Sequence, residues 1–147
     1  MRFNRGFTLI ELIIALAIAG LLTSLAWSGY ESRIQATNFN LMREVASTLA
    51  LKQQQHRQTF GQYASKVKNS GKASASTLVL TEHSDFNTTI LSADFRSFSA
   101  AVQPKKGSLS IKRECATLIV QSQQGYLSFK SLGSNEKDST KECLPRG

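Results

Sequence analysis

The chain has 147 residues, with 18 Lys and Arg against 10 Asp and Glu, a net charge of +8, and two cysteines. This length fits one domain, and the sequence contains no internal repeat, no Gly-rich phosphate loop and no alternation of strands with helices. The composition therefore excludes a repeat array and a doubly wound nucleotide-binding fold.

The first predicted element is an apolar helix that is long enough to cross a membrane. Residues 7–30 are almost continuously apolar, and a helix of this length spans ~36 Å, more than the ~30 Å of a bilayer core. Arg2 and Arg5 precede the run, so we expect that end to stay in the cytoplasm and the rest of the chain to be exported. The run contains one carboxylate, Glu11, which costs ~2.5 kcal/mol or more in hydrocarbon if it is ionised and unpaired.

The order of segments around Glu11 differs from that of an ordinary secretory signal. An ordinary signal places its cleavage site after an apolar core of about 7–15 residues, whereas here a short basic leader and a Gly6-Phe7 junction come before the apolar run. The stretch G-F-T-L-I-E-L at Gly6–Leu12 resembles the class III signal of type IV prepilins and related pseudopilins. Without this motif, Glu11 would be interpreted as a carboxylate that stays protonated or reaches the membrane surface.

The resemblance implies a processing route and a role for Glu11. It implies a dedicated peptidase that cuts between Gly6 and Phe7 and methylates the new amino group of Phe7. It also implies that Glu11 pairs with the terminal amine of a neighbouring subunit, which compensates a buried charge. The chain then divides into a prepilin leader, a transmembrane and polymerisation helix, and an exported globular domain: residues 1–6, 7–30 and 31–147.

The helix is predicted to continue beyond the membrane. Residues 31–58 contain no proline. An apolar stripe recurs there at helical spacing: Ile34, Leu41, Val45 and Leu49, with Met42 and Ala46 alongside. We expect one helix from about Phe7 to Arg57, which ends in the polar run 53–58 before Gly61.

The alternative is two helices broken near Ser28-Gly29. Many type IV pilins carry a proline at the position of Ser28, and this chain lacks it. A bend in this region is then expected to come from Gly20 or Gly29 and to be mild.

After this helix, the sequence predicts an irregular connection and then a sheet. Residues 61–85 are rich in Gly, Ser, Lys and Asn, with Tyr63 and Val67 as packing anchors. Four β-rich runs follow, with a turn at 104–107 and a hairpin through 123–125: 86–91, 95–103, 115–122 and 126–130. A helix followed by about four antiparallel strands predicts an α+β roll with the sheet laid over the helix. The resemblance implies the same fold, that of pilins.

Cys115 and Cys143 lie in the part of the chain that is predicted to be exported. An even cysteine count and an oxidising compartment favour a disulfide, with two free thiols as the alternative. In the chain-entropy model, a disulfide that closes the loop between Cys115 and Cys143 stabilises the fold by ~3 kcal/mol. It would also tie a weakly ordered C-terminal tail to the third strand, which is predicted to begin at Cys115. A C-terminal disulfide loop is also usual in type IVa pilins, which makes residues 131–147 a candidate contact surface.

The sequence offers little for catalysis or metal binding. His56 falls in the polar run and His83 in a loop, without a sequence-local partner for either, and Asp85 and Asp94 bracket a strand. No nucleophile motif such as G-x-S-x-G occurs. We therefore expect no enzyme activity, no cofactor and no metal site.

Positive charge is the second functional signal. Residues 31–147 carry 16 Lys and Arg against 9 Asp and Glu. Clusters of such residues can neutralise phosphates, so DNA is a candidate ligand of Lys66, Lys68, Lys72, Lys105, Lys106, Lys112 and Arg113. The alternative is a soluble basic surface that complements acidic neighbours. No aromatic residue is interleaved with the lysines, which argues against a stacking platform for single strands.

The combined expectation is a type IV pilus subunit, a minor pilin similar to those of the PilE type. Its expected partners are other pilin subunits, the prepilin peptidase and methyltransferase, and the inner-membrane assembly machinery. It is expected in the bacterial inner membrane with a cytoplasmic N-terminus, and then in a pilus that serves twitching motility, adhesion or DNA uptake. The rival interpretations are a type II secretion pseudopilin, against which the disulfide loop argues, and a DNA receptor for natural transformation.

Overall fold

The computed structural model describes residues 8–80 and 85–144, without the side chains of residues 25–28. The elements in chain order are α1 (Leu9–Phe60), β1 (Lys66–Lys68), β2 (Thr77–Val79), β3 (Phe86–Ala93), β4 (Ser97–Pro104), η1 (Arg113–Cys115), β5 (Thr117–Gln123), β6 (Tyr126–Leu132) and α2 (Thr140–Cys143). The chain falls into two compact units, residues 1–34 and 35–147.

Helix α1 begins with a side-chain cap. The backbone N–H of Glu11 donates to Thr8 Oγ1 at 3.4 Å, so Thr8 satisfies one of the donors that a helix start leaves without an intrahelical partner. Leu12 then makes the first regular bond, to the Thr8 carbonyl at 3.3 Å. Phe7, where the sequence predicts the helix to begin, lies outside the described residues.

Helix α1 runs without interruption to Phe60, so the expected continuous helix is confirmed and a break near Ser28-Gly29 is wrong. The helix also extends past its predicted end at Arg57. Gly61 follows with φ +77°, and its N–H donates to the Arg57 carbonyl at 2.8 Å. A left-handed residue after the last turn is a common way to end a helix, and glycine adopts that conformation without a steric penalty.

Between residues 35 and 60, one face of α1 is buried. Met42, Ala46 and Leu49 have no exposed surface, whereas Leu41 is 36% exposed and Val45 only partly buried. The predicted stripe is therefore displaced by about one residue. Met42, Ala46 and Leu49 are spaced four and three residues apart, which places them on one side of a helix.

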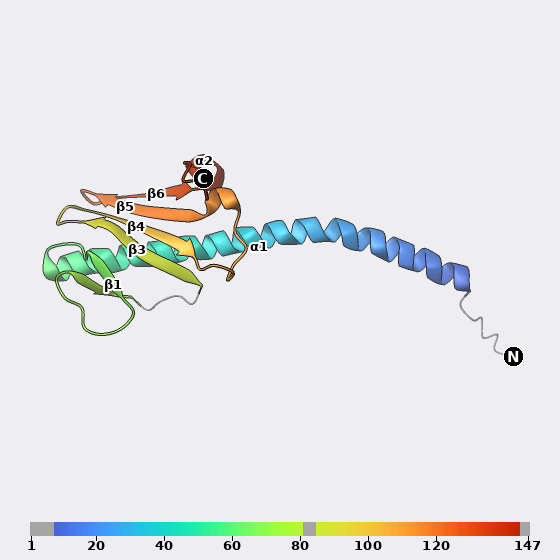
Figure 1. Cartoon of the computed structure of the whole chain (residues 1–147), viewed down its shortest axis with the longest axis horizontal. Coiled ribbons are helices and arrows are strands. Elements are labelled where there is room, and N and C mark those ends of the chain that lie inside the picture. The colour runs from blue at the N-terminus through green and yellow to red at the C-terminus, as the bar shows by residue number, and fades with distance from the viewer. Residues whose placement is uncertain (1–7, 81–84, 145–147) are drawn as a thin grey trace. The chain divides into compact units, whose positions relative to one another are not determined.

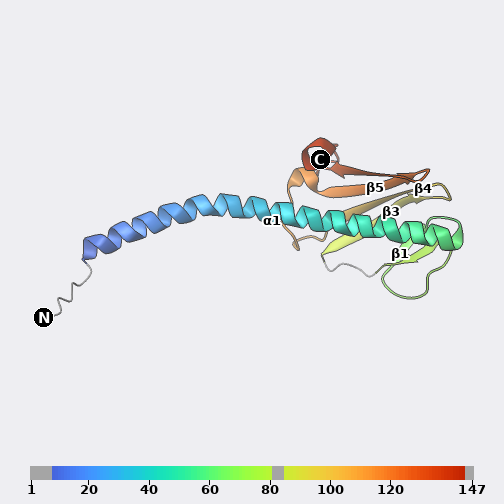
Figure 2. The ribbon, with the colours of Figure 1, turned by 180° about the vertical axis from the view of Figure 1, so that it is seen from behind.

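A four-stranded antiparallel sheet in the order β3-β4-β5-β6 packs on this face of α1, as two opposite views show (Figure 1 and Figure 2). Buried side chains alternate along β4 and β5 and face the helix: Phe98, Ala100, Val102, Leu118 and Val120. The predicted fold, an α+β pilin-like arrangement of a long helix and four antiparallel strands, is confirmed.

The second strand of this sheet starts later than predicted. β4 begins at Ser97 because Asp94 closes a turn in front of it. The Asp94 carboxylate accepts hydrogen bonds from the backbone N–H groups of Arg96 and Ser97, each at 2.6 Å. These bonds, the Arg96 bond first, hold the pKa of Asp94 below its ordinary value of 3.8.

The third strand also starts later, at Thr117, because Cys115 belongs to the short helix η1. The predicted hairpin between β5 and β6 is confirmed. Its turn has positive φ at Gln124 and Gly125, 51° and 90°, which matches the twist of two adjoining antiparallel strands.

The connection between α1 and β3 contains more structure than predicted. β1 and β2 form a short parallel pair with Val67 opposite Leu78, so the expectation of an irregular segment is wrong there. The anchoring role of Tyr63 and Val67 is confirmed, since Tyr63 is buried and Val67 packs against the core. The apolar residues that form this pair are too few to stand out among the surrounding Ser and Lys.

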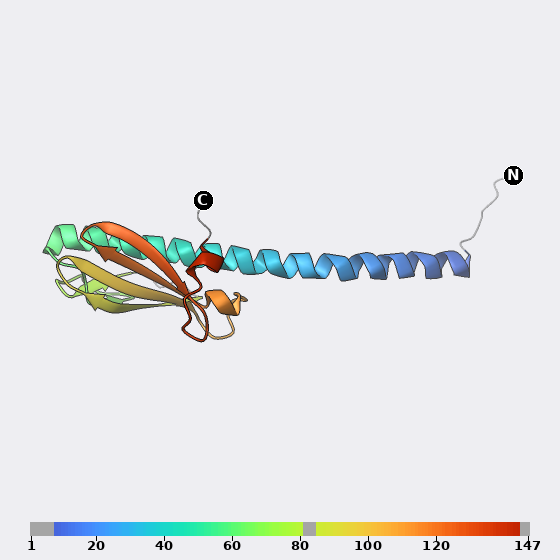
Figure 3. The ribbon, with the colours of Figure 1, turned by 90° about the horizontal axis from the view of Figure 1, so that it is seen from above.

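The chain after β6 is folded back by hydrogen bonds, so the expectation of a weakly ordered tail is wrong. The N–H of Gly133 donates to the Lys137 carbonyl and that of Ser139 donates to the Ser131 carbonyl, each at 2.9 Å. Helix α2 follows and lies beside η1 (Figure 3). The predicted disulfide between Cys115 and Cys143 joins these two short helices.

Candidate functional site

The first part of α1 has no buried face. Every described side chain between residues 8 and 24 is exposed. The large apolar ones have exposed fractions of 53% to 76%: Leu9, Ile10, Leu12, Ile13, Ile14, Leu16, Ile18, Leu21 and Leu22. A helix that is apolar on all sides needs lipid or protein around it. Among the described residues, α1 is the one helix that is long and apolar enough to cross a membrane.

Glu11 is the one charged side chain between residues 8 and 24. It lies in the first turn of α1, where the hydroxyl of Thr8 donates to Glu11 Oε2 at 3.4 Å. The backbone N–H groups at a helix start favour a negative charge at this position. One long contact to a hydroxyl leaves the carboxylate with capacity for a further donor, because an ionised carboxylate can accept about four hydrogen bonds.

This segment also matches a known family model. The prokaryotic N-terminal methylation motif matches residues 1–27, which contain Glu11 and the apolar surface around it. The match supports a prepilin-like protein of the type IV pilin family. The motif identifies a pilin-like or pseudopilin subunit, and together with the apolar helix it suits anchoring in the inner membrane before assembly. No curated protein and no solved structure matches the chain.

The predicted cleavage junction of this pilin-like chain, Gly6-Phe7, lies outside the described residues. Both residues fall within the matched motif. Cleavage at the junction and methylation of Phe7 stay predictions, as does the pairing of Glu11 with a neighbouring subunit.

A second candidate surface surrounds the disulfide. The N–H of Ser134 donates to the Arg113 carbonyl at 2.7 Å, and a Cβ on Gly133 would lie 3.5 Å from that same carbonyl. The loop after β6 is therefore packed closely on η1. An open polar hollow lies over this contact, lined by Arg113, Glu114, Ser134, Asn135, Lys137, Asp138, Ser139 and Glu142. Hydrogen bonds from Thr140, that of its side chain first, lower the pKa of Asp138.

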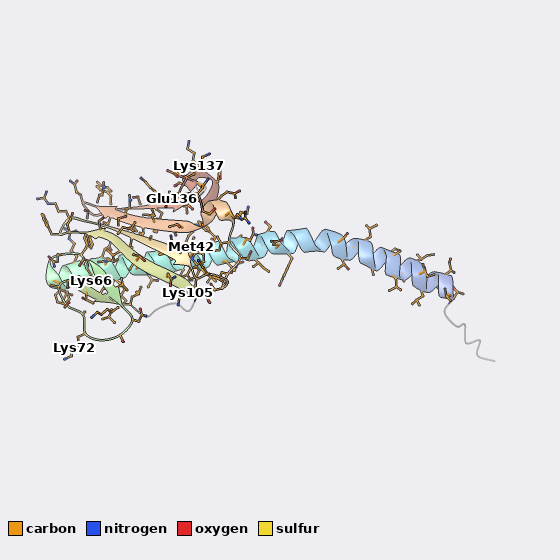
Figure 4. All side chains as sticks on the ribbon, viewed as in Figure 1. Met42, Lys66, Lys72, Lys105, Glu136 and Lys137 are labelled. Atoms are coloured by element: carbon orange, nitrogen blue, oxygen red, sulfur yellow. A yellow bond between two sulfur atoms is a disulfide. The ribbon has the colours of Figure 1, made fainter. Side chains whose placement is uncertain are left out.

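This hollow overlaps the contact surface predicted at residues 131–147, of which residues 131–144 are described. The exposed side chains of residues 131–144 carry both signs of charge, as Glu136 and Lys137 illustrate in Figure 4. The surface is polar and exposed to solvent, and its role as a contact surface stays a prediction.

The structure separates the predicted basic residues into two groups. The first group lies on β1 and in the loop that follows it, with every side chain exposed: Lys66, Lys68 and Lys72. The second group lies after β4 and at η1: Lys105, Lys106, Lys112 and Arg113. Figure 4 shows Lys66 and Lys72 at one end of the sheet and Lys105 away from them.

Gln53 belongs to the polar run predicted at the helix end, and its side chain is fully buried. Its Nε2 donates to the Ala64 carbonyl and its Oε1 accepts from the Ala64 N–H, both at 2.9 Å. The side-chain amide of Gln53 therefore pairs with both the N–H and the carbonyl of Ala64, a residue that lies outside the helices and strands. Gln53 follows Leu49 by four residues, and this spacing was the signal available in the sequence.

His56, for which the sequence offers no nearby catalytic partner, is buried against two backbone carbonyl groups. His56 is 4% exposed, and its two ring nitrogens lie within hydrogen-bond distance of the carbonyl oxygens of Gln62 and Ser74. His83 lies outside the described residues. Within the described ranges, no three His, Cys, Asp or Glu side chains gather into a group that could hold a metal ion.

Proposed function

We propose that this chain is a minor subunit of a type IV pilus. One combination supports the proposal: a helical segment that is apolar on all sides, a carboxylate in its first turn, and the N-terminal methylation motif over both. In this proposal the segment first anchors the precursor in the inner membrane and later packs among other pilin subunits. The exported domain, residues 31–147, then takes part in twitching motility, adhesion or DNA uptake.

Processing precedes assembly in this proposal. The prepilin peptidase cuts between Gly6 and Phe7 and methylates the amino group of Phe7, and that amine pairs with Glu11 of a neighbouring subunit. An unpaired carboxylate in a membrane helix costs ~2.5 kcal/mol or more, and a well-placed cation offsets much of that cost. The pair therefore favours transfer of the subunit from lipid into the filament, in the register that brings the two charges together.

Replacing Gly6 tests the processing step. In cells that express the full chain, Gly6→Val should leave uncleaved precursor in the membrane and remove the protein from sheared pili. Gly20→Val is the matched control for cleavage, because Gly20 lies in the same segment away from the junction and its Cβ position has no neighbouring atom of this chain within 4 Å. Mass spectrometry of the N-terminus reads cleavage and methylation together. Normal cleavage of the Gly6→Val chain would contradict the proposal.

A pseudopilin of a type II secretion machine is the second candidate, because such proteins carry the same motif. The disulfide between Cys115 and Cys143 favours the pilus, since a C-terminal disulfide loop is usual in type IVa pilins. Deleting the gene and scoring piliation, twitching, DNA uptake and secretion separately distinguishes the two. Lost secretion with normal piliation would establish the pseudopilin and remove the pilus proposal.

DNA is the candidate ligand for the exposed lysine groups, and charge is the observation that favours it. The full chain in detergent micelles should shift duplex DNA at low salt and release it as the salt rises. Two double variants locate the binding group: Lys66 and Lys68 both changed to Glu, and Lys105 and Lys106 both changed to Glu. The DNA shift should be lost only in the variant whose reversed charges belong to the group that binds DNA. No shift at low salt, or an unchanged shift in both double variants, would remove DNA as the ligand.

A further inference from the structure

Asn87 is an exposed amide on β3 that the pilus proposal does not use. It begins the sequence Asn87-Thr88-Thr89, which is the Asn-x-Thr acceptor pattern of N-linked glycosylation, with x any residue except proline. Asp85 stands two positions earlier, and an acidic residue there is typical of acceptor sites in bacteria. The sequence contains six asparagines, and the other five lack a Ser or Thr two positions later. The pattern therefore selects one asparagine in the whole chain.

The fold presents this asparagine to solvent. Phe86 is 1% exposed and belongs to the core, whereas Asn87 and Thr89 are exposed, because successive side chains of a strand lie on opposite faces. In the ladder, Asn87 lies opposite Gln103 of β4. β3 is an end strand of the four-stranded sheet. A substituent on the Asn87 amide therefore extends away from the core of the globular unit.

The surface beside Asn87 suits a sugar. An open hollow of about 300 Å³ lies between β3 and the β1–β2 pair, and this volume is at the lower end of the range for ligand pockets. The described residues that line the hollow are uncharged, and five of them carry an amide or a hydroxyl group: Asn69, Asn87, Thr88, Thr89 and Gln103. Amides and hydroxyls offer both donors and acceptors, which is what the hydroxyl groups of a sugar require. The acceptor pattern and the hollow thus point independently to the same chemistry.

We infer that Asn87 is the attachment site of an N-linked glycan whose first sugar lies in this hollow. The sugar donor is a lipid-linked oligosaccharide, and the enzyme is a membrane oligosaccharyltransferase that acts on the outer side of the inner membrane. This inference rests on export of the globular domain, which is part of the proposed function. It does not depend on cleavage of the leader or on assembly into a pilus.

The transfer step forms one bond and breaks one. The amide nitrogen Nδ2 of Asn87 attacks C1 of the first sugar, and the bond between C1 and the diphosphate oxygen of the donor breaks. The lipid diphosphate leaves with the electron pair of that bond, and one amide proton passes to a base of the transferase. The hydroxyl of Thr89 belongs to the acceptor pattern that the transferase recognises. No oxidant or reductant takes part.

The position of Asn87 in a strand sets the order of events. In the folded domain, residues 86–93 pair with β4, so the acceptor segment is accessible to a transferase before this ladder forms. The glycan is then added to the exported chain before the sheet is complete, and it stays outside the core as the domain folds. Because β3 is an end strand, a hydrated glycan beside it also opposes the addition of a strand from another chain.

Mass spectrometry of the chain isolated from its own host tests the inference. Trypsin cleaves after Lys72 and Arg96, and the peptide of residues 73–96 contains Asn87 as its one asparagine. This peptide should carry the added mass of a glycan, and fragmentation should place that mass on Asn87. An unmodified peptide would overturn the inference. The N-terminal peptide of the same sample reports cleavage between Gly6 and Phe7, so the failure of the glycan and the failure of the pilus proposal are read separately.

Three variants distinguish an N-linked glycan from a modification of the neighbouring hydroxyl groups. Asn87→Gln and Thr89→Ala should each abolish the added mass, because each destroys the acceptor pattern. Thr88→Ala is the matched control and should keep the added mass, since the middle position of the pattern accepts any residue except proline. An added mass that survives in Asn87→Gln would belong to a Ser or Thr side chain and would overturn the inference.

Discussion

The two parts of helix α1 have the same secondary structure and opposite surroundings. Between residues 8 and 24 every described side chain is exposed, with Leu9 at 76%, whereas between 35 and 60 one face is buried, with Met42 at 0%. An apolar pattern on all sides requires apolar surroundings on all sides, and a stripe requires a partner on one side only. The comparison shows that the chain supplies the core for the second part of α1, while lipid or other subunits must cover the first.

A pair of leucines on the same helix tests this comparison most strongly. Leu49→Ala should lower the free energy of unfolding of the globular unit by ~2–5 kcal/mol, because Leu49 is fully buried against the sheet. Leu51→Ala, at a side chain that is 61% exposed, should change it by less than ~0.5 kcal/mol. Thermal unfolding of the full chain in detergent micelles measures both. Equal losses would show that the buried face is assigned wrongly.

The disulfide is expected to stabilise the globular unit and to leave the first part of α1 unaffected. Changing Cys115 and Cys143 together to Ser should cost ~3 kcal/mol in the chain-entropy model. Membrane insertion of the precursor should stay normal, since the cysteines belong to the other unit. Denaturant unfolding and membrane fractionation give the two readings. An unfolding free energy equal to that of the wild type would contradict a structural role.

Two glutamines in the polar run sharpen the comparison within the second part of α1. Gln53→Ala should cost ~1–3 kcal/mol, because the N–H and carbonyl of Ala64 lose their partner in a buried place. Gln55→Ala is the matched control, since Gln55 is exposed and should tolerate the change within ~0.5 kcal/mol. Chemical denaturation of both variants in parallel measures the difference. A change of less than ~0.5 kcal/mol in Gln53→Ala would mean that water replaces the side chain as the hydrogen-bond partner of the Ala64 backbone.

Asp94 is expected to give the smallest effect, visible only in acid. Its pKa is lowered by hydrogen bonds that require the carboxylate, so its contribution to stability is present above its ordinary value of 3.8 and is lost as the pH falls through the folded-state value. Asp94→Asn should therefore flatten the acid limb of the stability profile, read from melting temperatures at a series of pH values. An unchanged acid limb in Asp94→Asn would show that the loss of stability in acid comes from other carboxylates.

The elements that could be predicted from the sequence are those with a local physical signal. The apolar run at 7–30, the strand pairs and the hairpin at Gln124-Gly125 follow from periodicity and turn chemistry. The disulfide followed from cysteine count and compartment. The motif around Glu11 indicated a pilin-like subunit because cleavage junction, carboxylate and apolar length occur together, and the match over residues 1–27 supports this prediction.

The features that could not be predicted depend on contacts between distant segments. Gln53 and His56 look like an exposed polar end, and only the backbone groups of Ala64 and Ser74 make them buried partners. The β1–β2 pair and the folded loop after β6 likewise depend on hydrogen bonds across the fold, not on local propensity. For Gln53, the one signal in the sequence was its position four residues after Leu49, on the buried side of the helix.

The pairing role of Glu11 is tested most directly by its incorporation into pili. In cells that express the full chain, Glu11→Gln should be cleaved at a wild-type rate and then accumulate in the membrane, with about a tenfold or greater loss from sheared pili. Glu44→Gln, at an exposed carboxylate on the globular part of the same helix, should assemble normally. Wild-type incorporation of the Glu11→Gln subunit would contradict the account.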